Sequence, residues 1–244
     1  HDLILSGDLV SIEAGAVQIY RRARARSGLS VNPTRDLELP APRPDEVEIV
    51  AAADAARLLE PLPVGDKPIW ATALYAGLRY GELRALRWRA VDFEAGTIRV
   101  EESWDPKAGP IEPKTRTSRR ITPMPHPLRE LLRNHRELLG KPAADELVFG
   151  LARGGPFNSA ALYHRADSAW EEAGLSGRLR LHQARHSYAS YLIAAGANAK
   201  AISAFMGHSS INVTFDLYGH LMPGTEAEVA SMLGSYLRAE SDTS

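Results

Sequence analysis

Six side chains in this sequence have the types and the spacing of one site that handles a phosphate group: Arg79, Lys114, His182, Arg185, His208 and Tyr218. Tyr218 comes ten residues after His208 and 33 residues after Arg185. A tyrosine phenol can attack a phosphodiester, and cationic or hydrogen-bonding groups can hold the phosphate oxygens. The set therefore predicts covalent chemistry at phosphorus.

The chemistry explains why these residue types belong together. A phosphodiester is anionic, and attack adds negative charge to its non-bridging oxygens, so donors aimed at the pentavalent state lower the barrier. Loss of one such donor costs about 10² to 10³ in rate. A free phenol has a pKa of about 10, so nearby cations favour its attack at neutral pH. Guanidinium groups can replace the metal ions that many nucleases use, and the sequence has no evident carboxylate cluster.

Taken singly, several of these residues also have structural interpretations. Arg79 lies in an apolar stretch where Glu82 could pair with it, and the segment alone does not choose between that ion pair and a phosphate. His182 and Arg185 project from one face of an expected helix, which alone fits a surface arginine and a core histidine. His182 and His186 have the spacing of a zinc site. The expected general-base position holds Gln, however, and no third ligand has a recognisable spacing, so we expect no metal.

The remaining three residues are no more specific by themselves. Lys114 lies in an expected hairpin turn, where lysine is usually exposed, although a turn also lets a proton donor swing onto a leaving group. Tyr218 ends a short expected helix, and a tyrosine is most often a half-buried aromatic residue. His208 follows Gly207, an expected helix end, so one tight turn and a short helix can bring positions 208 and 218 to one pocket.

The composition is that of an ordinary globular protein, with 244 residues of which 44% are hydrophobic and 24% charged. The absence of cysteine excludes disulfides and thiolate metal sites and suits a reducing cytoplasm. No apolar run reaches the roughly 18 residues that span a bilayer. The net charge of −1 argues against nucleic-acid binding. Basic residues gather without acids at 114–120 and 176–186, however, and such a face can bind DNA or simply be solvated.

The N-terminal part has a different character from the rest. Residues 17–26 predict a basic helix that Gly28 would end, and the prolines of 32–44 predict a linker. The chain begins with His1 rather than Met, which suggests that something N-terminal is missing. We therefore expect three parts: the end of a preceding domain at 1–30, a linker at 31–44 and the main domain at 45–244.

From residue 45 onward the pattern predicts helices and one small antiparallel sheet. The alternation of residues 97–101 predicts a strand that pairs with 119–122, with Lys114 near the turn. Ser209 or Ser210 would begin one helix, and Gly196 would end another. The expected helices cover residues 52–60, 67–78, 81–89, 127–139, 158–173, 182–195, 198–206, 210–217 and 225–238.

Five motifs, in this order and at these separations, resemble those of one family. They are Gly-Leu-Arg-x-x-Glu-Leu at 77–83, Pro-Lys-Thr-x-x-Ser-x-Arg at 113–120, His-x-x-Arg-His at 182–186, Gly-His-Ser-Ser at 207–210 and Thr-x-x-x-Tyr-x-His at 214–220. Over about residues 45–240 the chain resembles the tyrosine recombinases of the phage integrase and Xer type. The resemblance implies an α+β fold, mainly α: a helical catalytic domain with a small antiparallel β-sheet. It also implies that residues 1–30 end a DNA-clamping domain.

The resemblance implies a role for each of the six residues. Tyr218 would be the nucleophile, Arg79 and Arg185 the phosphate clamps, and His208 a further donor to the phosphate. Lys114 would be the general acid for the leaving 5′-hydroxyl. His182 would be an acid–base or positioning group. Family members commonly have an acidic residue at the position of Gln183. We therefore expect the hydrogen bonds around this residue to differ from those of the family, while the site itself is the same.

The implied function is a site-specific DNA recombinase that cuts and rejoins DNA through a 3′-phosphotyrosyl intermediate, for integration or excision, without metal, ATP or cofactor. The alternatives are a type IB topoisomerase, which shares the chemistry but not strand exchange, and a catalytically silent DNA-binding regulator. The implied partners are double-stranded DNA, a homotetramer on DNA joined through the C-terminal helix at 224–239, and accessory DNA-bending or directionality proteins. The implied location is the cytoplasm of a bacterial or phage-infected cell, with no membrane partner.

Overall fold

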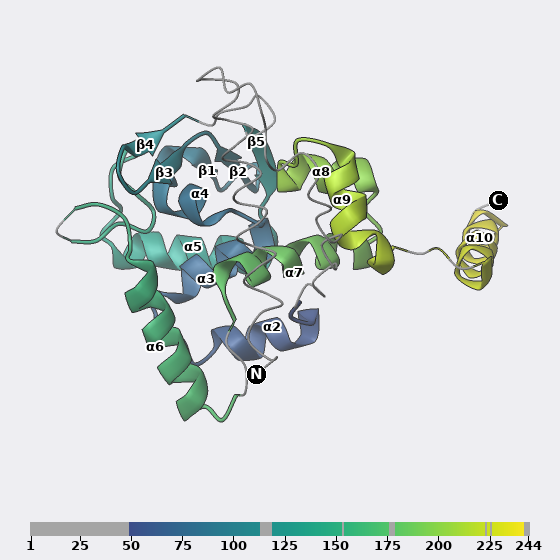
Figure 1. Ribbon diagram of the computed structural model, residues 1–244, viewed down its shortest axis with the longest axis horizontal. Helices are drawn as coiled ribbons and strands as arrows, with labels where there is room; N and C mark the ends of the chain where they lie inside the picture. Colours follow the sequence, from purple (N-terminus) through teal and green to yellow (C-terminus); the bar gives the residue numbers. More distant parts are fainter. Residues whose placement is uncertain are drawn as a thin grey trace, which may run out of the picture. The chain divides into compact units, whose positions relative to one another are not determined.

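The computed structural model describes residues 49–112, 119–152, 154–175, 179–222, 224 and 226–241 (Figure 1). The chain divides into two units between residues 46 and 47, and all the described residues belong to the second unit. The expected domain remnant at 1–30 and linker at 31–44 lie outside the described residues, and so does Lys114. In the described part, no helix has the length and apolar character needed to cross a bilayer.

The described chain is mainly helical with small antiparallel sheets, which confirms the expected fold class. Most of the expected helices are present to within two residues at each end. Short 3-10 turns follow two of them, at Trp88–Ala90 (η1) and Gly219–Leu221 (η3). The α-helices are α2 (Ala52–Leu59), α3 (Lys67–Ala76), α4 (Tyr80–Ala85), α5 (His126–Leu138), α6 (Ser159–Glu172), α7 (Leu181–Ala194), α8 (Ala199–Met206), α9 (Ile211–Tyr218) and α10 (Glu226–Ser241).

The expected helix over 81–89 is wrong in its second half, because α4 ends at Ala85. The chain there pairs with a distant segment instead of continuing its own helix. Leu86 O accepts a hydrogen bond from Val148 N at 2.8 Å, and Trp88 N donates to Glu146 O at 3.1 Å. These long-range bonds satisfy the backbone groups that an extended α4 would have paired internally, so tertiary structure overrides the local pattern.

The sheet confirms the expected pairing and contains strands that the sequence pattern missed. β2 (Thr97–Val100) pairs antiparallel with β5 (Arg120–Pro123), and β1 (Val91–Asp92) adds to the other edge of β2. A second hairpin, β3 (Ser103–Asp105) with β4 (Gly109–Ile111), occupies what we expected to be a plain connection. Its turn is closed by the Asp105 carboxylate, which accepts two backbone N–H bonds.

The packing of α3 and α8 decides which residues meet. α3 is apolar on all sides and lies in the centre of the described unit, where Trp70 and Leu74 are fully buried and α7 packs along it (Figure 1). α8 lies against both α7 and β5. The C-terminal end of α3, the start of β5, the middle of α7 and the end of α8 therefore converge, although more than 100 residues separate the first from the last.

Candidate active site

A glycine turn at the end of α3 places the first arginine of the site. Gly77 has a left-handed backbone with φ 65°, and a Cβ atom there would lie only 2.2 Å from the ring of Tyr188 on α7. Glycine is therefore required for both the turn and the close helix contact. Two residues later the chain enters α4 with Arg79 as its N-cap residue, in extended conformation.

The C-terminal end of α8 is capped by three arginines from three other elements. Arg120 on β5 donates from Nε to the carbonyl of residue 205 at 2.6 Å. Arg185 on α7 donates from Nη2 to the carbonyl of residue 206, and Arg79 donates from Nη2 to the carbonyl of residue 207 at 2.7 Å. The last carbonyls of a helix lack partners within the helix and carry partial negative charge, so guanidinium groups stabilise that end.

Glu82 on α4 joins two of these arginines. Its carboxylate accepts two bonds from Arg120, both of 2.8 Å, and further bonds from Nη1 of Arg79 at 2.9 Å and from the Arg79 backbone N–H at 2.8 Å. Burial alone would raise the pKa of Glu82, but the hydrogen bonds from Arg120 and the charges of Arg120, Arg185 and Arg79 outweigh it and lower the pKa to about 2. The carboxylate is therefore ionised at neutral pH.

The cluster holds more positive than negative charge. Three guanidinium groups, those of Arg79, Arg120 and Arg185, share Glu82 as their carboxylate within the described part of the chain. Burial, followed by the charge of Arg79, lowers the pKa of Arg185 to about 9, which leaves it charged at neutral pH. The Arg79 side chain is 40% exposed, so the cluster opens to solvent at that residue. An excess of partly buried positive charge is stabilised by an anion.

The two interpretations of Arg79 that the sequence left open are therefore not exclusive. Arg79 does pair with Glu82, as the structural interpretation requires. The same carboxylate is also bound by Arg120 through two bonds, and the Arg120 side chain is only 4% exposed. The buried charge of Glu82 is thus matched by Arg120, and Arg79 remains able to bind a phosphate from its exposed side.

The structural interpretation of α7, a surface arginine beside a core histidine, is reversed in the structure. Arg185 is 8% exposed and donates to the carbonyls of Gly77 and Met206, so it joins the C-terminal ends of α3 and α8. His182 is exposed at the start of α7. The guanidinium group lies inside because two helix ends supply it with acceptors.

The side-chain amide of Gln183 caps the N-terminal end of α7. Its Oε1 accepts the backbone N–H of Arg180, the N-cap residue of α7, at 2.6 Å. Glu82 accepts the backbone N–H of Arg79 at the start of α4 in the same way. A neutral carbonyl oxygen suffices for this bond, so the departure from an acidic residue at position 183 keeps the local helix start intact.

Tyr218 lies beside the arginine cluster, and its side chain is 0% exposed. Its hydroxyl is hydrogen-bonded to Nδ1 of His186 at 2.5 Å. Its ring lies nearly parallel to the ring of His208, at a tilt of 9° and a centroid distance of 6.3 Å. Burial raises the pKa of Tyr218 to about 12, and the charge of Arg185 acts in the opposite direction. The phenol is therefore protonated at neutral pH.

His208 is placed by the end of α8. Gly207 takes a left-handed conformation with φ 61°, and the His208 backbone N–H returns to the carbonyl of Ser203 at 3.0 Å. The His208 ring is hydrogen-bonded through Nδ1 to Thr214 Oγ1 at 2.8 Å. Burial, followed by the charges of Arg185 and Arg79, lowers the pKa of His208 to about 4. The imidazole is therefore neutral at pH 7.

Of the six residues singled out in the sequence, the structure brings four together at one place: Arg79, Arg185, His208 and Tyr218. His182 is near them on the same helix face, with its ring centroid 6.3 Å from that of His186. Lys114 lies outside the described residues. The expected start of α9 at Ser210 is confirmed, because the Ser210 hydroxyl accepts the N–H of Asn212.

Three contributors to the site were missed or undervalued by sequence reasoning. The sequence motifs contain Arg120, Glu82 and His186 without giving any of them a part in the site. Beyond that, the sequence suggested Glu82 only as a partner for Arg79 and His186 only as a zinc ligand. A useful signal was available for Arg120, because it alternates with the outward-facing Ile121 on β5 and so points inward.

The described arginines of the two basic stretches do not form a solvated basic face. Arg120 and Arg185 turn inward, whereas Arg119 pairs with Glu112 and Arg180 pairs with Asp167. The remaining basic residues of these stretches lie outside the described residues. Of the described arginines in these two stretches, Arg120 and Arg185 therefore add their charge to the cluster around Glu82.

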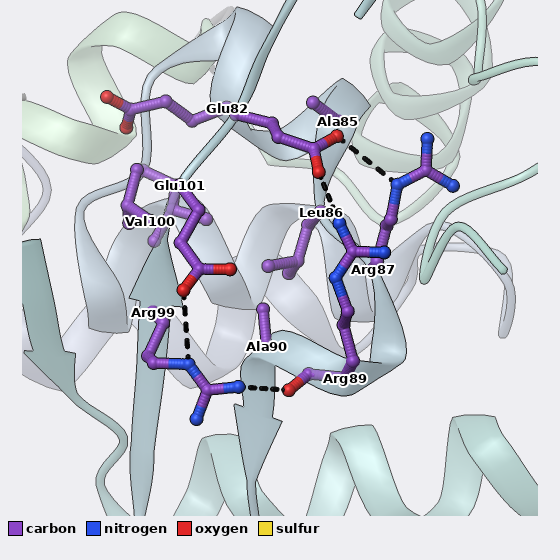
Figure 2. A pocket seen from close by; sticks show the side chains of 11 residues that line it. Glu82, Ala85, Leu86, Arg87, Arg89, Ala90, Arg99, Val100 and Glu101 are labelled. Atoms are coloured by element: carbon purple, nitrogen blue, oxygen red, sulfur yellow. Dashed lines mark hydrogen bonds and ion pairs between the residues drawn. The ribbon is translucent and has the colours of Figure 1, made fainter. Parts of the chain in front are cut away.

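A pocket beside α4 is also rich in arginine but has a different character (Figure 2). Arg87 and Arg89 both contact Glu102, and Arg99 contacts Glu101. Each of these cations thus has a carboxylate partner, which indicates a structural network rather than an anion site.

The electrostatics of the site predict loss of stability in acid. The pKa of Glu82 is lower in the folded state than its ordinary value of 4.5, so its ionised form stabilises the fold above pH 4.5, and this contribution of about 3 kcal/mol is lost as pH falls towards 2. His186 and His208 have folded-state pKa values of about 4, below the ordinary 6.5, so they also destabilise the fold as pH falls from 6.5 to 4. Denaturant unfolding at pH 7, 5 and 3 should give a steadily falling free energy. A constant free energy down to pH 3 would contradict this account.

Within the described ranges, no three His, Asp or Glu side chains are grouped so that they could hold a metal ion. A model of the phage integrase family matches residues 43–224. Two bacterial relatives are each 30% identical: a XerC-like tyrosine recombinase of Caldanaerobacter subterraneus, aligned over 190 residues, and the prophage integrase IntR of Escherichia coli, aligned over 193. The alignments cover 68% and 69% of this chain but 48% and 46% of the relatives, so the chain spans about half their length.

Solved structures show the same fold. The Tn1549 transposon integrase in complex with transposon right end DNA has a TM-score of 0.71 at 20% identity, over 95% of this chain and 80% of its own. A lambda integrase dimer bound to a COC′ core site has a TM-score of 0.56 at 19% identity, over 88% of this chain and 61% of its own. The family model covers well over half of the chain, and the protein therefore belongs to the phage integrase family.

Proposed function

We propose that this chain is the catalytic part of a site-specific DNA recombinase that cuts and rejoins DNA through a 3′-phosphotyrosyl intermediate. The observation that carries the proposal is the excess of guanidinium charge around Glu82, directly beside a tyrosine. A phosphodiester supplies the missing negative charge, and its phosphorus is the atom that a phenol can attack. The family and the relatives favour recombination over the topoisomerase and silent-regulator alternatives.

In this proposal Arg79 and Arg185 hold the non-bridging oxygens, and His208 donates a further hydrogen bond. Burial and the links to helix ends fix the Arg185 side chain before DNA arrives, so this clamp itself needs little reorganisation. Arg79 is the more exposed of the two and makes the first contact with the phosphate. Lys114 is proposed as the general acid on the leaving 5′-oxygen, and His182 as an acid–base or positioning group.

The reaction exchanges one ester for another. The Tyr218 phenol gives up its proton to solvent and its oxygen forms a bond to phosphorus as the bond to the 5′-oxygen breaks. The 5′-oxygen takes a proton from Lys114 in its proposed role and leaves as a hydroxyl. A different 5′-hydroxyl then attacks the phosphotyrosine and restores the phenol. The bond energy of the backbone is retained, so no ATP is required, and the guanidinium groups stabilise the developing charge in place of a metal ion. A bacterial cytoplasm containing chromosomal DNA suits the reaction.

The function is tested by recombination between two copies of a DNA site selected from a random pool by the full-length protein. On a supercoiled plasmid in EDTA and without ATP, two directly repeated sites should yield two separate circles. Relaxed plasmid of unchanged sequence, formed equally on plasmids without the site, would instead support a topoisomerase. Binding without any cleaved product would support a silent regulator.

We also propose that α10 docks on a second copy of the protein when recombinase subunits assemble on DNA. One face of this helix is apolar and solvent-exposed: Val229, Met232, Leu233 and Tyr236 are each more than half exposed. Ile211 and Phe215 give α9 a second apolar surface, with exposed fractions of 39% and 49%. Large exposed apolar side chains at helical spacing are typical of an interaction surface.

Deleting the residues after position 223 should therefore abolish recombination while DNA affinity falls by less than tenfold. The reason is that the apolar face of α10 contacts protein rather than DNA in the proposed assembly. Recombination and DNA binding are measured on the same preparations, with the double substitution Met232→Ser and Leu233→Ser as a folded control for the truncation. Equal loss of binding and recombination would contradict the docking role.

A further inference from the structure

His186 is a partly buried, hydrogen-bonded residue to which the six-residue assignment gives no role. It lies on α7 directly after Arg185, and its Nδ1 is 2.5 Å from the Tyr218 hydroxyl oxygen. Its ring lies between two aromatic neighbours, 5.8 Å from the ring of Tyr218 and 6.3 Å from that of His182. The contact joins a catalytic helix to the phenol across 32 residues of sequence.

The protonation states fix the direction of this hydrogen bond. Burial, followed by the charges of His182 and Arg185, lowers the pKa of His186 to about 4, so the ring is neutral at pH 7. Burial raises the pKa of Tyr218 to about 12, so the phenol keeps its proton. The phenol therefore donates to the lone pair of Nδ1. Because the imidazole is a much weaker base than the phenolate, the contact holds the protonated phenol rather than removing its proton.

Tyr218 lies in a closed, largely apolar environment. Its side chain is 0% exposed and packs with Tyr188, Ile202 and Met206, so a DNA phosphate cannot reach the hydroxyl in this arrangement. Attack requires Tyr218 to leave this environment, and every contact that holds it there opposes the attack. Among the described residues, the hydrogen bond to His186 is the polar contact of the Tyr218 hydroxyl, and it would be broken in that movement.

We propose that His186 is a positioning residue that holds the Tyr218 hydroxyl in a sheltered state and so sets how often the nucleophile becomes available. The inference rests on the proposed function, because the availability of Tyr218 matters for the reaction only if Tyr218 is the nucleophile. The sheltering itself is a property of the free protein and is tested without DNA. Arg185 is the residue next to His186. When Arg185 binds a phosphate, Tyr218 would move from this sheltered state to the reactive state.

The test measures nitration of individual tyrosines by tetranitromethane, followed by peptide mass spectrometry, on the free chain at pH 8. In the wild type, Tyr218 should react slowly and Tyr236, which is 60% exposed, rapidly. His186→Ala should raise the rate at Tyr218 roughly two- to tenfold, the range expected for loss of one hydrogen bond. His186→Asn, whose side-chain oxygen lies near the position of Nδ1, should restore the slow rate.

Two controls separate the hydrogen bond from simpler explanations. Tyr188 is buried on the same helix and bonded to Thr122, so its nitration rate should be unchanged by every His186 variant. His186→Leu fills the space without an acceptor and should react as fast as His186→Ala. The proposal would be overturned if Tyr218 were still nitrated slowly in His186→Leu. It would also be overturned if the nitration rate of Tyr188 rose together with that of Tyr218. An unchanged rate at Tyr218 in His186→Ala would overturn it too, whereas absence of any DNA adduct would count only against the proposed function.

Discussion

Tyr218→Phe is expected to abolish formation of the covalent protein–DNA complex while leaving DNA affinity within about twofold of the wild type. The substitution removes the oxygen that attacks phosphorus and keeps the aromatic ring that packs against His208. It also removes the bond to His186, which changes the free energy of unfolding by only about 1 kcal/mol. Adducts are measured on a nicked suicide substrate by denaturing electrophoresis, and affinity by gel shift.

A matched control for this prediction is Tyr236→Phe. Tyr236 lies on the exposed face of α10, away from the arginine cluster in sequence, and its loss should leave the adduct yield on a single bound site unchanged. If the adduct survives in Tyr218→Phe and disappears in Tyr236→Phe, the nucleophile is Tyr236 on the C-terminal helix. An adduct that survives in both would exclude tyrosine at either position.

Arg120→Met is expected to destabilise the fold by about 3–5 kcal/mol, the cost of removing the buried partner of a buried charge. Arg120 supplies two of the bonds to the Glu82 carboxylate and one to the end of α8, and its side chain is 4% exposed. Methionine keeps most of the side-chain volume, so the loss reports the charge and the hydrogen bonds. The measurement is denaturant unfolding at pH 7.

Arg119→Met is the control, because the neighbouring residue is 57% exposed and pairs with Glu112 at the surface. An exposed pair of this kind contributes at most about 1 kcal/mol. The double variant Arg120→Met with Glu82→Leu removes both buried charges and should recover part of the lost stability. Equal effects of the two single arginine substitutions would show that the buried pair does not support the site.

The pattern of residue types located most of the helices and the β2–β5 pairing, because apolar spacing and capping residues are local properties. It failed where distant chain segments decide the local structure. α4 ends early because Leu86 and Trp88 pair with residues 146–148, and that partner is invisible in a local window. The β3–β4 hairpin was missed because its strands are only three residues long.

The candidate site shows the same division. Residue types and order pointed to Arg79, Arg185, His208 and Tyr218, and the structure brings these four together. The direction in which each side chain points depends on tertiary partners. Arg185 is buried because the ends of α3 and α8 meet beneath it, which α7 alone does not reveal. Arg120 and His186 gain their importance from neighbours 38 and 32 residues away.

The most direct test of the account is to identify the residue that becomes joined to DNA. The wild-type protein is trapped on a suicide substrate that carries its selected site, digested with protease and nuclease, and sequenced by tandem mass spectrometry. We expect a nucleotide linked through its 3′-phosphate to the oxygen of Tyr218. A nucleotide on any other residue, or a linkage through a 5′-phosphate, would contradict it.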